Sequence, residues 1–141
     1  MRAVTLYRIA SILLVLFAAG HTFGFLKFRP ATAEGLAVWD GMSRVHFQVR
    51  GSTFSYGGFY MGFGLCITVY VLFLAFLSWH LGTLAENNPQ AIGLVGWMLC
   101  LVQVATLALS WKYFAAIPTI FAAVLTICTG WAAWLAGSAK L

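Results

Sequence analysis

Four long apolar stretches without a charged residue limit the fold of this chain more than any other feature. They run over residues 9–26, 54–85, 91–111 and 113–135. A helix that crosses the hydrocarbon core of a membrane needs about 20 mostly apolar residues. Only 8% of the residues are charged, against roughly 25% in soluble domains. The runs lack the alternation of barrel strands, and open sheet edges cannot face lipid. The sequence therefore predicts an all-α integral membrane protein.

Short connections predict how the later stretches are joined. Glu86-Asn87-Asn88-Pro89 is a turn, because Asn favours turns and Pro resists continuing a helix. Lys112 alone separates the third stretch from the fourth, so these two form a tight antiparallel hairpin. We expect one domain over residues 1–141, a four-helix up-down-up-down bundle with spans at about 9–26, 54–80, 91–111 and 113–135. The second run is longer than one span needs and must tilt or project at an end.

The first apolar stretch has an alternative interpretation as a secretory signal. Arg2 and Arg8 precede it, and the small residues at 18–20 resemble a cleavage site. Phe23 and Leu26 extend the apolar run past that site to the length of a span, so we expect it to be retained. We expect a multi-pass protein of the cytoplasmic (inner) membrane. Its orientation stays open, because basic residues flank the first span equally on both sides.

The connection over residues 27–52 holds most of the charged residues and has a helical pattern. Its apolar positions recur every three or four residues. They are Leu36, Trp39, Met42, Val45 or His46, and Val49. Thr32 is suited to cap the start of such a helix, whereas Gly35 and Gly41 weaken it. We expect a short amphipathic segment in the plane of the membrane interface.

Pairs of glycines occur on both sides of this connection. Gly20 and Gly24 lie four residues apart near the end of the first span, and Gly58 and Gly62 lie four apart near the start of the second. Paired small residues let membrane helices approach closely. We expect these two pairs to pack against each other.

Polar and aromatic residues gather at the same end of the first two spans. His21 lies inside the first span, and an ionisable side chain there is a candidate for function. A structural alternative is a neutral imidazole bonded to a Tyr or a backbone carbonyl, and the tyrosines alternatively belong to the interfacial aromatic belt. The candidate ligand-binding mouth comprises His21, Trp39, Asp40, His46, Tyr56, Phe59, Tyr60 and Phe63.

The sequence predicts no metal site and no cofactor. Cys66, Cys100 and Cys128 stand alone, without the spacing of metal ligands. A haem held by two histidines needs both at one depth, and His21 and His80 are expected on opposite sides of the bilayer, because each lies near the end of its span and the two spans run in opposite directions. The basic residues lie at membrane faces and form no run that suggests nucleic acid.

Two motifs carry a family resemblance. They are A-x-G-H-T-x-G-F over residues 18–25 and F-x-x-x-G-x-x-x-S-Y-x-x-F-Y-x-G-F-G-L over residues 47–65. The chain resembles a family of small bacterial four-helix membrane proteins with no assigned activity, and more loosely the DoxX-like membrane proteins. The resemblance implies the four-helix fold, and it implies no catalytic role. The family positions that it marks are His21, Gly51, Tyr56, Tyr60, Gly62 and Gly64.

Three hypotheses of function stay open at this point. The first is a binding module, whose mouth holds a small lipophilic molecule such as a quinone or a lipid fragment. The second is a structural or accessory subunit, which packs against a membrane protein partner or a second copy of itself. The third is an enzyme with His21 or His46 as general base, which would need Asp40 or Glu34 to orient it.

Overall fold

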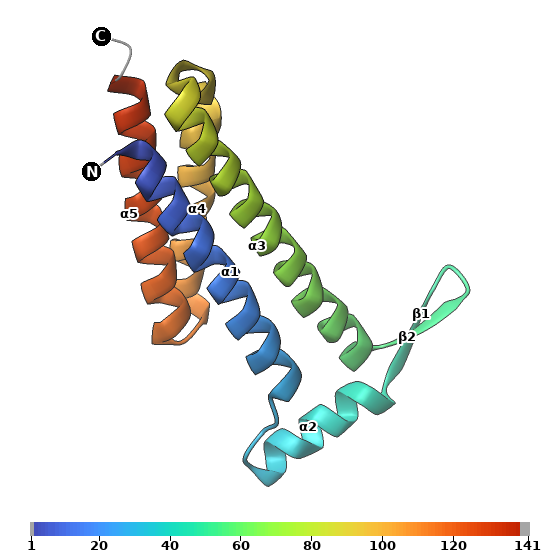
Figure 1. The fold of residues 1–141 in the computed structure, drawn as a ribbon. Helices are drawn as coiled ribbons and strands as arrows, with labels where there is room; N and C mark the ends of the chain where they lie inside the picture. The colour runs from blue at the N-terminus through green and yellow to red at the C-terminus, as the bar shows by residue number, and fades with distance from the viewer. Residues whose placement is uncertain (1, 139–141) are drawn as a thin grey trace. The chain divides into compact units, whose positions relative to one another are not determined.

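The computed structural model describes residues 2–138, and most of them are helical. Four helices are long and apolar enough to span a membrane, which fits a multi-pass membrane protein. The fifth helix, α2, and a β-hairpin lie between the first two of them in sequence (Figure 1). In order, the elements are α1 (Ala3–Lys27), α2 (Ala33–Arg44), β1 (His46–Val49), β2 (Ser52–Ser55), α3 (Tyr56–Asn87), the short 3-10 helix η1 (Pro89–Ile92), α4 (Gly93–Tyr113) and α5 (Ala116–Ser138).

The helices extend beyond the predicted spans. A charged residue interrupts an apolar run, but the helical backbone can continue through it. α1 begins at Ala3 and includes Arg8, and α3 continues to Asn87. Arg8 is accommodated because its guanidinium carbon lies 3.6 Å from the centroid of the Trp79 ring. Its Nη2 also donates a hydrogen bond to Thr83 Oγ1, at 3.0 Å. These contacts to α3 offset part of the cost of burying the charge, although Arg8 Nη1 is buried without a hydrogen-bond partner among the described residues.

The connection between α1 and α3 begins as predicted and then departs from the prediction. Thr32 caps α2, its side chain accepting a hydrogen bond from the backbone N–H of Gly35 at 3.1 Å. The apolar spacing runs on to Val49, and the helix, expected to be short or broken, ends at Arg44. Val45 is already extended, with φ −80° and ψ 126°, and the chain then forms the antiparallel pair β1–β2.

The turn of the hairpin explains why the helix does not continue. Phe47 pairs with Phe54 and Val49 with Ser52, so two residues join the strands. These are Arg50 and Gly51, with φ of 49° and 84°. Positive φ at both positions is the geometry of a type I′ turn, which matches the twist of the strands. Gly51 adopts this conformation without steric cost.

The chain divides into two compact units. One unit combines the chain up to Phe17 with the chain from Val71 onward, and the other comprises Ala18–Tyr70. In the first unit, α4 and α5 lie side by side and antiparallel (Figure 1). A Cβ at Gly96 would lie 3.4 Å from Ala133. The core of this unit comprises Leu6, Tyr7, Ala10, Leu14, Ala75, Leu81, Ile92, Leu99, Leu125, Cys128, Ala132 and Ala136.

Small polar side chains join α1 to α3 in the first unit. Ser11 Oγ donates to the carbonyl of Ala75 at 2.8 Å, and Ser78 Oγ donates to the carbonyl of Tyr7 at 2.9 Å. Because the later residue of α1 pairs with the earlier residue of α3, the two segments run antiparallel. Hydroxyls of this kind are a common link between membrane helices.

The type I′ turn generates a prediction for the hairpin. Gly51→Val forces a β-branched residue into a left-handed conformation, at a cost of about 1–2 kcal/mol. We expect amide hydrogen exchange of residues 46–55 to become roughly 5–30-fold faster, measured by mass spectrometry. Ser52→Val is the matched control, because position 52 lies in a strand, where Val is favourable. Equal protection in the two variants would contradict this geometry.

Candidate functional site

The candidate site is a groove in the second unit, between α2 and the start of α3. Its volume is about 330 Å³, within the range of about 300–1,000 Å³ that is usual for small-molecule sites. α2 and α3 can form it because the hairpin returns the chain from the end of α2 to the start of α3: the backbone N–H of Tyr56 bonds the carbonyl of Val45 at 3.3 Å. The lining residues are Trp39, Met42, Ser43, Gly57, Gly58, Tyr60 and Met61.

A row of rings connects the groove to His21. The His21 ring stacks on Phe25, with centroids 5.7 Å apart. Phe25 lies 5.2 Å from Tyr60, and Tyr60 meets Trp39 edge to face at 6.1 Å. Aromatic pairs of this kind stabilise a fold by about 0.5–1.5 kcal/mol, in addition to the free energy gained by burying their surface. The row therefore fixes the two aromatic residues of the groove relative to α1.

His21 bonds a backbone carbonyl, as the structural alternative predicted. Its Nε2 lies 3.1 Å from the carbonyl oxygen of Gly64, and since that oxygen only accepts, Nε2 carries the proton. One turn farther along α3, the hydroxyls of Thr22 and Thr68 lie 2.8 Å apart. His21 thus helps to join α1 to α3 within this unit.

The glycine that permits this close approach is Gly64. A Cβ at Gly64 would overlap the ring of Phe25. The predicted glycine pairs are placed differently: a Cβ at Gly20, Gly24 or Gly62 would meet no atom within 4 Å.

Gly58 does not contact α1 either. The only atom near a Cβ added there is Ser55 Oγ, at 3.1 Å. The predicted packing of Gly20 and Gly24 against Gly58 and Gly62 is therefore not found in the described residues. The four-residue spacing pointed to the right helices and to the wrong glycines, because spacing does not reveal which face of α3 turns toward α1.

Three of the predicted site residues belong to a second aromatic cluster, around Phe47 of the hairpin. The ring of Phe47 lies 4.8 Å from Tyr56 and 5.7 Å from Phe59, and Phe59 lies 4.8 Å from Phe63. A two-stranded hairpin is marginally stable alone. Tyr56 and Phe59 therefore hold the hairpin against α3, and Phe63 packs on Phe59. None of the three lines the groove.

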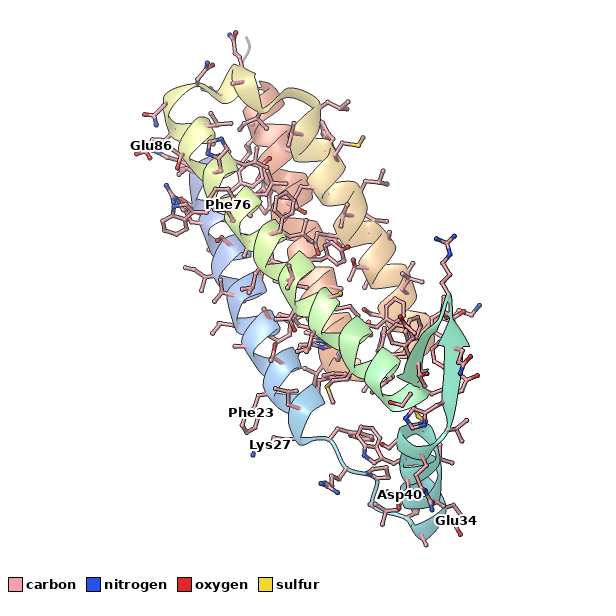
Figure 2. The ribbon with its side chains drawn as sticks, turned by 90° about the vertical axis from the view of Figure 1, so that its right-hand side faces the viewer. Phe23, Lys27, Glu34, Asp40, Phe76 and Glu86 are labelled. Carbon is pink, nitrogen blue, oxygen red and sulfur yellow. The ribbon has the colours of Figure 1, made fainter. Side chains whose placement is uncertain are left out.

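Asp40 and His46 also lie outside the groove lining. Asp40 is exposed on α2, as is Glu34 (Figure 2). His46 is exposed, and its Nδ1 lies 2.7 Å from the carbonyl oxygen of Arg44. Of the eight predicted residues, Trp39 and Tyr60 line the groove. His21 does not line it and is linked to Tyr60 through Phe25.

Several residues that line the groove or are buried in the core were not identified as such from the sequence. Met42, Ser43 and Met61 line the groove, and their spacing on α2 and α3 was a signal that could have been used. In the first unit, Gln103 is buried, with 2% of its surface exposed. A single Gln in an apolar run is an available signal for an interior position, because an amide facing lipid is costly.

The groove is suited to binding and lacks obvious catalytic groups. Trp39 and Tyr60 offer apolar ring surfaces, Met42 and Met61 are adaptable in shape, and Ser43 provides a hydroxyl that donates to the carbonyl of Trp39 at 3.3 Å. Among residues 2–138, no group of three or more His, Cys, Asp or Glu side chains is placed to hold a metal ion.

Comparison with protein-family models, curated proteins and solved structures finds no match to this chain. The geometry of the groove and its surroundings therefore carries the functional argument alone.

The contact between Gly64 and Phe25 generates a prediction. Gly64→Ala should displace the Phe25 ring and lower the free energy of unfolding by about 1–3 kcal/mol, as overpacking does elsewhere. The measurement is the melting temperature in detergent micelles, which should fall. Gly62→Ala is the matched control, two residues away in the same helix with open space around it. Phe25→Leu combined with Gly64→Ala should recover part of the loss. Indistinguishable melting of the two single variants would refute the close approach.

Proposed function

We propose that this chain is a membrane-embedded binding protein for a small lipophilic molecule, and that the ligand occupies the groove between α2 and α3. The supporting observation is the groove of about 330 Å³ that includes Trp39 and Tyr60. The two rings are held edge to face by a row of rings that extends to α1. A preformed aromatic wall lowers the entropy lost on binding.

The lining indicates the chemistry of the ligand. Three residues offer soft, apolar surface, namely Trp39, Met42 and Met61, and the polar groups are the hydroxyls of Ser43 and Tyr60. None of the lining residues is charged. The ligand is therefore neutral and mainly apolar, with one or two hydrogen-bonding oxygens, as in a quinone head group or a lipid fragment.

The membrane topology belongs to the same proposal. α1, α3, α4 and α5 cross the cytoplasmic membrane up-down-up-down as one bundle, and α2 lies in the interface with the groove on its membrane side. Antiparallel contacts between α1 and α3 support this arrangement. Exposed Glu34 and Asp40 on α2 suit a helix that has one face in water.

The open, small surface of Gly20 and Gly24 favours a second candidate function, a subunit that packs against another membrane helix.

The topology is tested by cysteine accessibility on a cysteine-free background. Single cysteines at positions 34 and 112 should react with a membrane-impermeant maleimide from one side, and a cysteine at position 86 from the other. The physical reason is that α3 lies between 34 and 86, and η1 with α4 between 86 and 112. Labelling of 34 and 86 from the same side would overturn the topology, and the sidedness of 34 would give the orientation.

Ligand binding is tested by native mass spectrometry of gently extracted protein. We expect a copurifying adduct or, after delipidation, binding of an added short-chain ubiquinone or lysophospholipid, the two probes standing for the two ligand classes. Trp39→Leu with Tyr60→Leu should abolish the adduct, because it removes both ring surfaces and the phenol. The control is Tyr70→Leu with Trp97→Leu, an exposed Tyr and an exposed Trp that do not line the groove.

Two results would count against the proposal. Equal loss of the adduct in the test and control pairs would mean that the lipid is held without the groove. No adduct in any variant, together with a second membrane protein or a stable dimer in all of them, would favour the accessory-subunit function.

A further inference from the structure

A small cavity, partly open at the surface, lies in the first unit and shares no lining residue with the groove. Its volume is about 40 Å³, and all four long helices contribute to it. Apart from Gln103 and Thr106 its lining is apolar, comprising Leu14, Phe17, Val71, Leu74, Pro118, Phe121, Ala122 and Leu125. A cavity with an entirely apolar lining normally stays dry, whereas polar lining groups such as these two make hydration favourable.

Gln103 has an unmet requirement for hydrogen bonds. It is 2% exposed, and its Nε2 has no hydrogen-bond partner among the described residues. It lies at the middle of α4, about 15 Å from either end at 1.5 Å per residue. Leaving a buried amide unpaired is unfavourable, because the hydrogen bonds that it makes to water in the unfolded chain are lost and not replaced. At this depth the surrounding lipid offers no compensating donor or acceptor.

Thr106, whose side chain is exposed, provides a second polar group at the mouth of the same cavity. It lies three residues from Gln103, so the two share a face of α4. Its hydroxyl donates to the carbonyl of Val102 at 2.8 Å, which leaves the lone pairs of Oγ1 available as acceptors. A half-turn of the Gln103 amide exchanges its oxygen and nitrogen, so either end can meet the cavity.

We propose that this cavity is a water site at the centre of the membrane-spanning region, with water as a bridge from Gln103 to Thr106. The amide of Gln103 donates one hydrogen bond to the water, and the water donates one to Thr106 Oγ1. A cavity of about 40 Å³ exceeds the roughly 10–15 Å³ that one water needs. Two polar partners meet the minimum for a buried water. The site is independent of the proposed ligand groove.

The test is NMR of protein labelled with ¹⁵N in its glutamine side chains, in lipid nanodiscs or micelles. The chain has three such residues, Gln48, Gln90 and Gln103, and the signal lost in Gln103→Leu identifies the third. We expect a cross-peak between the Gln103 amide protons and water, with the sign of the nuclear Overhauser effect that marks long-lived water. Ala122→Val, which narrows the cavity, should abolish the cross-peak.

Ala123→Val is the matched control, because Ala123 lies next in sequence and lines a different groove. It should leave the Gln103 cross-peak unchanged. A folded wild-type spectrum without a water cross-peak at Gln103 would overturn the proposal. So would a cross-peak that survives in folded Ala122→Val, because it would then arise by exchange through the Thr106 hydroxyl without a bound water.

Discussion

Hydrogen bonds from side chains on one helix to backbone carbonyls on the other are the interaction on which this structure depends. In the first unit, Ser11 and Ser78 make them between α1 and α3. In the second unit, His21 makes one to Gly64. Such bonds require the backbones to approach closely, which is why Gly64 lies under the ring of Phe25. Between apolar helices in lipid, hydrophobic burial gives little preference for one register over another, so polar contacts and close packing select it.

The proposed ligand groove follows from this register in the second unit. Phe25 contacts Tyr60, and Tyr60 contacts Trp39 of α2, so the seam between α1 and α3 also sets the aromatic wall of the groove. The hairpin contributes on the other side of α3, where Phe47 packs against Tyr56 and Phe59. α2 is held through Trp39, which contacts Tyr60 of α3 and Phe28 of the preceding connection, although none of the residues of α2 is buried. A helix held mainly by contacts at its edge leaves room for a groove.

The sequence was sufficient to predict the helices and insufficient to predict the site. Four apolar runs imply four long helices, and Thr32 was correctly identified as the cap of α2. The hairpin was missed, because a three-to-four residue spacing up to Val49 resembles a helix, whereas the turn at Arg50 and Gly51 is a local signal. Which of several glycines contacts α1, and which rings face Trp39, depends on the rotation of α3. Because nearly every position of this helix is apolar, its pattern does not reveal that rotation.

The central claim is that a lipophilic molecule occupies the groove between α2 and α3, and the methionines test it most directly. Met42 and Met61 line the groove, whereas Met98 lies on α4 with 46% of its surface exposed. Photo-methionine, a diazirine analogue, can replace all of them in living cells and crosslink whatever molecule lies beside each one. We predict that irradiation attaches one discrete lipophilic species to Met42 or Met61, with only mixed bilayer lipid on Met98. The same mixture on all three positions would contradict the claim.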